Sequence, residues 1–118
     1  MITIEQLAQA ALNGESLRLR SLTQDLLREQ PLLSAYPKPQ TQDSRLLTTA
    51  AALLELLAGR LHQAPPLWTS EIGALADPVY LLKEATQMRR LRTLCETEAP
   101  EPLRKRGLYA PPNFLEFV

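Results

Sequence analysis

The fold is decided by residues 43–61, which read DSRLLTTAAALLELLAGRL. Leucine and alanine, both strong helix formers, recur here three and four positions apart. These apolar positions cover more than half of the helix circumference, whereas a helix at a protein surface is apolar along one stripe only. The stretch therefore predicts a central helix with neighbours on several sides, opened by Asp43 or Ser44 as its N-cap.

The composition of the whole chain favours the same class of fold. The 118 residues are 45% hydrophobic but only 5% aromatic. The β-branched and aromatic residues that strands prefer are scarce. A chain of this length forms one domain around one core. We expect an all-α fold, a compact bundle of about five to six helices with a proline-rich C-terminal arm.

The chain divides into three segments of this single domain, residues 1–118. Residues 1–30 predict an N-terminal helical hairpin, and residues 44–118 predict the main helical core and the C-terminal arm. Residues 31–43 hold three prolines and no sustained period, which is typical of a loop. That loop is either a linker between the two parts or an ordered connection. An ordered loop would be held by three side chains, those of Leu32, Leu33 and Tyr36.

Local signals mark the ends of the N-terminal helices. Thr3 followed by Gln6 predicts a capping box, in which each side chain satisfies a free backbone N–H. Gly14 predicts a helix stop because glycine adopts the left-handed conformation without strain. Ser16 then caps a second helix, which ends before Pro31.

Charge and targeting signals exclude some classes of function. The 13 basic and 13 acidic residues give a net charge of zero, so no global attraction to nucleic acid or an anionic membrane is implied. The N-terminus has no basic region followed by an apolar stretch, so no signal peptide is expected. The longest apolar run is too short to span a bilayer. We expect a cytoplasmic protein with no membrane partner.

The residue types that most often carry chemistry are too few to form a site. The chain has one cysteine, Cys95, and one histidine, His62, and they lie far apart in the sequence. A zinc site needs several ligands, and nucleophilic catalysis needs a nucleophile beside a base. Cys95 lies on the apolar face of a predicted helix, where a free cysteine is usually a small buried hydrophobe. We expect no metal, no cofactor and no enzymatic activity.

The C-terminal residues 98–115 are the most informative part of the sequence for function. They combine prolines, a basic triplet and aromatic side chains. They predict either a terminal segment packed over the Trp68 region or an arm that binds a partner, and both can hold. Tyrosine, phenylalanine and arginine are frequent anchors of protein interfaces. The candidate partner-binding residues are Arg104, Arg106, Tyr109, Phe114 and Phe117.

A basic face is the alternative binding surface. Arginines follow one another closely before and after position 95, and such a face would contact phosphates. Glu96, Glu98 and Glu101 interrupt the run, so a solvated helix surface is the simpler interpretation of it. The candidate nucleic-acid contacts are Arg89, Arg90, Arg92, Arg104, Lys105 and Arg106.

The order of these features resembles that of a known group of proteins. The leucine-rich helix is followed by Trp68, by residues 78–82, by APEPLRKRGLY at 99–109 and by NFL at 113–115. In this it resembles small helical bacterial proteins that accompany nucleotidyltransferase-fold toxins of the abortive-infection type and are regarded as antitoxins. The resemblance covers residues 44–118 and is most specific over 99–115. It implies that the chain binds and covers a toxin, and it transfers no catalytic residue.

Two functional hypotheses follow from the sequence. The first is a non-catalytic protein-binding module that neutralises or scaffolds a protein partner in the manner of an antitoxin. The second is a nucleic-acid-binding regulator that uses the arginine-rich face. A homodimer also remains open, because the apolar helix at residues 46–61 could be buried against a second copy.

Overall fold

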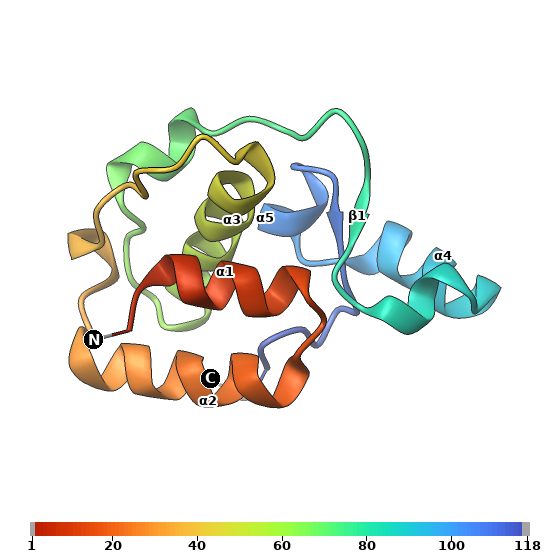
Figure 1. Cartoon of the computed structure of the whole chain (residues 1–118), viewed down its shortest axis with the longest axis horizontal. Helices are drawn as coiled ribbons and strands as arrows, with labels where there is room; N and C mark the ends of the chain where they lie inside the picture. The colour runs from red at the N-terminus through yellow and green to blue at the C-terminus, as the bar shows by residue number, and fades with distance from the viewer. Residues whose placement is uncertain (1, 117–118) are drawn as a thin grey trace.

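The computed structural model describes residues 2–116 and builds them around the helix α3 (Ser44–Arg60), as Figure 1 shows. Every residue from Thr48 to Ala58 is buried except Glu55, which is half-buried. Asp43 caps the helix, since its carboxylate accepts hydrogen bonds from the backbone N–H groups of Arg45 at 3.0 Å and Leu46 at 3.4 Å. The prediction of a central helix is confirmed, and elements of the same chain bury it.

The N-terminal hairpin packs against this helix. It consists of α1 (Ile4–Leu12) and α2 (Ser16–Glu29), with α1 lying between α2 and α3 (Figure 1). The capping box of α1 is present, because Thr3 Oγ1 accepts from the Gln6 backbone and Gln6 Oε1 accepts from the Thr3 backbone. The predicted helical hairpin is therefore confirmed together with its first cap.

The turn between the two helices depends on Gly14. This glycine has a φ of 70°, a conformation that costs glycine little. Ser16 is the first residue of α2, and the N-cap position is occupied by Glu15, whose side chain makes no capping hydrogen bond. The prediction of a stop at Gly14 is confirmed, but the prediction that Ser16 caps the second helix is wrong.

The loop between the hairpin and α3 is an ordered connection. It contains the short 3₁₀ helix η1 (Leu33–Ala35), in which Leu33 is buried, and Tyr36 after it is buried as well. The Trp68 indole N–H donates to the Tyr36 carbonyl at 2.9 Å and ties the loop to the segment after α3. Leu32, the third expected anchor, is instead 57% exposed.

After α3 the chain forms a series of short 3₁₀ helices, α-helices and strands. β1 and β2 form a two-stranded parallel pair, in which Val79 is opposite Leu108 and Tyr80 is opposite Tyr109. This pair was not predicted. Figure 1 shows α4 projecting from the body at the opposite end from the N-terminus. The elements are η2 (Leu67–Glu71), β1 (Val79–Tyr80), η3 (Lys83–Thr86), α4 (Arg89–Glu98), α5 (Glu101–Arg104) and β2 (Leu108–Tyr109).

The structure is mostly helical, with five α-helices in the described residues and a radius of gyration of 13.2 Å, as expected for a compact domain. The C-terminal segment, however, does not form a proline-rich arm. It folds as α5 and β2, because its apolar residues Leu103, Leu108, Ala110 and Leu115 are buried in the common core. Within residues 2–116, no helix is long and apolar enough to cross a bilayer.

Candidate partner-binding surface

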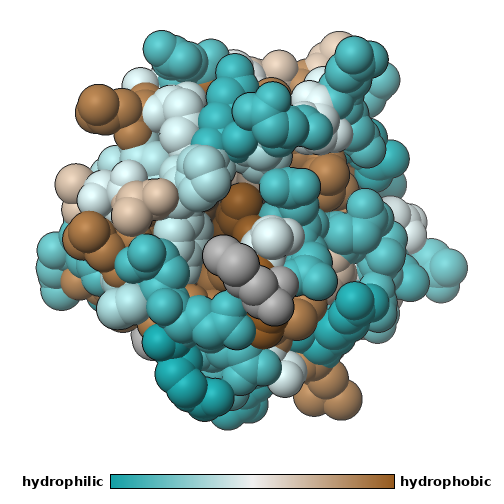
Figure 2. Space-filling view, turned by 60° about the vertical axis from the view of Figure 1, so that its left-hand side comes forward, coloured by the Kyte–Doolittle hydropathy of each residue, from teal (hydrophilic) through white to brown (hydrophobic). Residues whose placement is uncertain are grey.

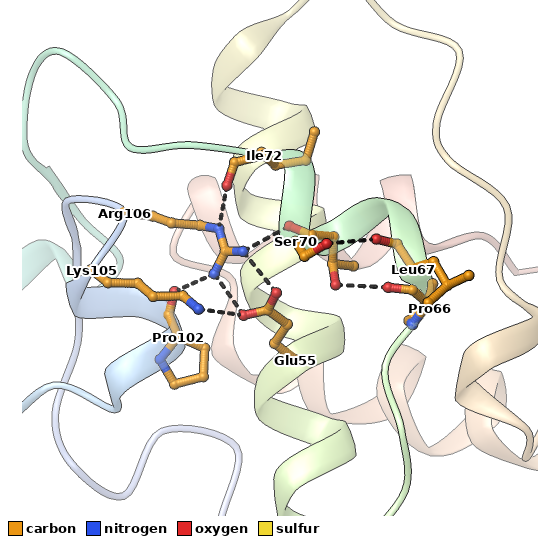
Figure 3. A network of polar contacts seen from close by, with 9 residues as sticks. Glu55, Pro66, Leu67, Ser70, Ile72, Pro102, Lys105 and Arg106 are labelled. Atoms are coloured by element: carbon orange, nitrogen blue, oxygen red, sulfur yellow. Dashed lines mark hydrogen bonds and ion pairs between the residues drawn. The ribbon is translucent and has the colours of Figure 1, made fainter.

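Arg106, one of the expected surface contacts, lies in the interior of the protein. Arg106 is only 2% exposed, and its guanidinium forms a bidentate pair with the Glu55 carboxylate at 2.9 and 2.8 Å. The remaining donors reach the backbone carbonyls of Ile72 and Pro102, both labelled in Figure 3, and the backbone carbonyl of Thr69. All five N–H groups are therefore used. The prediction that Arg106 contacts a partner or a phosphate is corrected: it links α3, η2 and α5.

Glu55 is the acceptor that makes this arrangement stable. Its carboxylate also forms an ion pair with the Lys105 ammonium at 3.0 Å. Partial burial alone would raise the pKa of Glu55, but the hydrogen bonds from Arg106 and Lys105 outweigh it and lower the pKa to about 2. Glu55 therefore stays ionised in the folded protein at neutral pH, which compensates the buried guanidinium.

Arg104 lies at the surface but is also engaged within the chain. Its guanidinium donates to the carbonyl of Thr97, in the last turn of α4, at 2.8 Å. The last turn of α4 has no basic residue of its own. Arg104 thus supplies, from α5, the cation that favours a helix C-terminus. Of the basic triplet, only part of the Lys105 side chain, 50% exposed, and Arg104 face solvent.

Tyr109, another candidate contact, lies on β2 beside a second aromatic side chain. It is half-buried, and its ring lies 5.5 Å from that of Tyr80 on the neighbouring strand, tilted by 40°. Such tilted pairs are favourable beyond the area that they bury. Phe114 is half-buried against the core, and Phe117 lies outside the described residues.

The three arginines of α4 remain at the surface. Arg89, Arg90 and Arg92 are exposed, and Arg92 makes a long ion pair of 3.9 Å with Glu96. The structure therefore separates the expected arginine-rich face into two parts. The arginines of α4 are exposed, whereas the basic triplet mainly holds the fold together.

Sequence reasoning missed two residues of this region, Glu55 and Tyr80. Glu55 is the only charged residue in the apolar stretch from Thr48 to Ala58. A charge in such a stretch indicates that Glu55 has a buried cationic partner, but it does not indicate which basic residue that partner is. Tyr80 had no comparable signal, because its contact with Tyr109 depends on strand pairing between distant segments.

The reactive residue types are placed apart from this surface or within the core. Cys95 is fully buried in α4, and burial together with the neighbouring Glu96 raises the pKa of its thiol. His62 is exposed just after α3 and has a positive φ of 56°. Among the described residues, no group of three or more His, Cys, Asp or Glu side chains is placed to hold a metal ion.

A hollow of about 320 Å³ lies at the opposite end of the molecule, between the start of α1 and the end of α2. Ile4, Leu26 and Tyr36 line it, and the Tyr36 hydroxyl bonds the carbonyls of Leu26 and Gln30 at 3.2 and 2.6 Å. Burial and then the charge of Glu29 raise the pKa of Tyr36 to about 12. This hydroxyl therefore stays protonated and closes the end of α2.

On the face in Figure 2, hydrophilic side chains separate the apolar patches.

Comparisons of the chain with models of protein families, with curated proteins and with solved structures gave no match.

Proposed function

We propose that this protein is a non-catalytic protein-binding module of the cytoplasm. The observation that supports this most is the accessible tyrosine pair, Tyr80 and Tyr109, beside the projecting helix α4. Large aromatic side chains that remain partly exposed on a compact fold are typical anchors of protein interfaces. Leu108 and Ala110 on either side of Tyr109 are buried in the core, whereas the two rings stay partly exposed and can contact a partner.

We further propose that the partner is a toxin of the nucleotidyltransferase fold, as the resemblance over residues 44–118 implies. The chain would act by occlusion: it would cover the toxin surface through which nucleotide or RNA enters. Such a mechanism needs an interface and no chemistry by this chain. Tyr109, the exposed side of Arg104 and the half-buried Phe114 remain in the proposed contact set from the sequence.

The nucleic-acid alternative is supported by the exposed arginines of α4 together with Arg104. The burial of Arg106 and the engagement of Lys105 with Glu55 remove two of its six expected contacts. A phosphate-binding surface gains its affinity from many cations acting together. The alternative is therefore the weaker of the two proposals.

Capture of partners by the tagged full-length chain in its native host tests the proposal. The capture is run at low and high salt, with and without nuclease. A single protein that survives both treatments is the expected result, because an apolar and aromatic interface depends little on salt. Recovery of nucleic acid that disappears at high salt would contradict the proposal and favour the alternative.

A further inference from the structure

The charges of α4 run against its own helix dipole. A helix is stabilised by acidic side chains at its N-terminus and basic ones at its C-terminus. In α4 the first turns carry Arg89, Arg90 and Arg92, and the last turn carries Glu96 and Glu98. The N-cap position is Met88, whose side chain forms no capping hydrogen bond. This arrangement opposes helix stability at the N-terminal end, whereas at the C-terminal end Arg104 of α5 supplies a cation through its hydrogen bond to the Thr97 carbonyl.

The helix gains little from packing to offset that cost. Among residues 89–98, all of which the structure describes, Cys95 alone is buried, and the main contact of α4 within the fold is the short 3₁₀ helix η3. Met88 is 57% exposed and Leu94 is 36% exposed, so apolar side chains flank the arginines in solvent. Acidic residues at the start of such a short projecting helix would stabilise it more than arginines do.

One of these arginines, Arg92, lies close to the tyrosine pair. Burial and then the nearby carboxylate of Glu96 raise the pKa of Tyr80, and the Arg92 charge acts on the same hydroxyl in the opposite direction. The side of α4 that carries Arg92 and Glu96 is therefore continuous with the surface proposed to bind a protein. Aromatic rings, exposed methionine and arginine together form a mixed surface of the kind found at interface centres.

We propose that the solvent-exposed surface at the start of α4, which carries Met88, Arg89, Arg90, Arg92 and Leu94, docks an acidic segment of the protein partner. The inference rests on the proposed function and specifies the chemistry of the partner. Carboxylates placed against the first turns of α4 would complement both its arginines and its dipole. The bound state thus supplies the negative charge that the first turn of α4 itself lacks.

The test compares two charge-reversal variants of the full-length chain in binding to the captured partner. R89E/R90E alters the proposed surface, and R18E/R28E is the matched control on α2, where both arginines are exposed and form ion pairs within their own helix region. We expect R89E/R90E to fold with unchanged or higher stability, because negative side chains at a helix N-terminus interact favourably with the helix dipole. Its Kd should rise about tenfold or more, while that of the control stays unchanged.

Salt dependence and crosslinking give independent readouts. The aromatic contacts should hold the complex together at high salt, but the wild-type Kd should still rise modestly with salt because of the arginines of α4, and R89E/R90E should lose most of that rise. A photo-crosslinker at position 94 should label a glutamate- and aspartate-rich segment of the partner, whereas one at Leu17, which is 83% exposed on α2, should not. Crosslinks to nucleic acid or to a basic segment would overturn the inference.

The failures of the two proposals are distinguishable. If the partner binds R89E/R90E as tightly as wild type, the docking role of α4 is excluded and the protein-binding function stands. If no protein is captured by the wild-type chain, both are excluded.

Discussion

Single side chains hold distant segments of this chain together, and the pair of Arg106 with Glu55 is the main example. Arg106 connects three elements through five hydrogen bonds. A buried ion pair adds little net stability compared with apolar residues, but removing one partner leaves an uncompensated charge. The pair therefore makes folding dependent on both residues at once.

Replacing Glu55 by alanine should lower the free energy of unfolding by about 3 kcal/mol, because Arg106 would stay buried without its counter-charge. Urea denaturation followed by the fluorescence of the single tryptophan, Trp68, measures this. Glu71→Ala, at an exposed position, is the control and should change the stability by less than about 0.5 kcal/mol. A small effect of Glu55→Ala would show that the pair is not essential to the fold.

Acid should weaken the protein through the same carboxylate. The folded-state pKa of Glu55 is about 2, below its ordinary value of about 4.3 in an unfolded chain. Its contribution is complete above about pH 5 and is lost as the pH falls toward about 2. We expect the wild-type stability to decline over this range, and Glu55→Gln to flatten the decline. An equally steep decline in Glu55→Gln would assign it to other carboxyl groups.

The basic triplet shows how far a sequence predicts single side chains. Arg104, Lys105 and Arg106 are adjacent and chemically alike, yet one caps α4, one is half-exposed and one is buried. The difference arises because Arg106 lies one turn after the buried Leu103 and faces the core, whereas its neighbours do not. A sequence predicts the cluster of charge, but the direction of each side chain depends on contacts between distant segments.

Among the elements, α3, the N-terminal hairpin and the helix that contains Cys95 were predictable from the sequence, whereas the strand pair β1 and β2 was not. Long runs of leucine and alanine specify a helix locally. The capping box and Gly14 mark the start and the end of α1, and Asp43 marks the start of α3. β1 and β2 contain two residues each, too few for an alternating pattern to be recognised. Their pairing also joins residues from separate parts of the chain, which local propensity does not encode.

The missing cap of α4 gives a prediction about that element. Met88 already has the extended backbone of an N-cap, with φ −111° and ψ 106°. Met88→Asp should raise the free energy of unfolding by about 1 kcal/mol, because the carboxylate accepts from free N–H groups and opposes the arginine charges. Thermal and urea denaturation measure it. A loss of stability would mean that Met88 contributes packing that outweighs the cap.

Two glycines make a matched pair of tests for helix and turn. A Cβ added at Gly59, in α3, would meet no atom of another element within 4 Å, so Gly59→Ala should stabilise the protein by about 0.5–1 kcal/mol. Gly14 has a φ of 70°, and a Cβ there would lie 2.8 Å from Lys83 Cε. Gly14→Ala should therefore destabilise by about 1 kcal/mol or more. Equal effects of the two substitutions in urea denaturation would contradict this assignment.

For the molecule as a whole, the proposed function follows from a contrast between its two ends. The core is closed around α3 by the hairpin and by the C-terminal segment, and the hollow near α1 has its main hydroxyl satisfied within the chain. At the other end, the tyrosine pair and α4 leave aromatic, apolar and arginine side chains accessible. The sequence predicted Tyr109 there, but it also placed Arg106 on the surface because burial of a single arginine has no local signature.

The affinity of the captured partner for a Tyr109→Ala variant tests the protein-binding proposal most directly. Circular dichroism first verifies that the variant folds, and Tyr109→Phe serves as a control that keeps the ring. We predict that Tyr109→Ala raises the Kd about 30-fold, as for an interface anchor, and that Tyr109→Phe changes it much less. An unchanged Kd for folded Tyr109→Ala would contradict the proposal that the tyrosine pair anchors a protein partner.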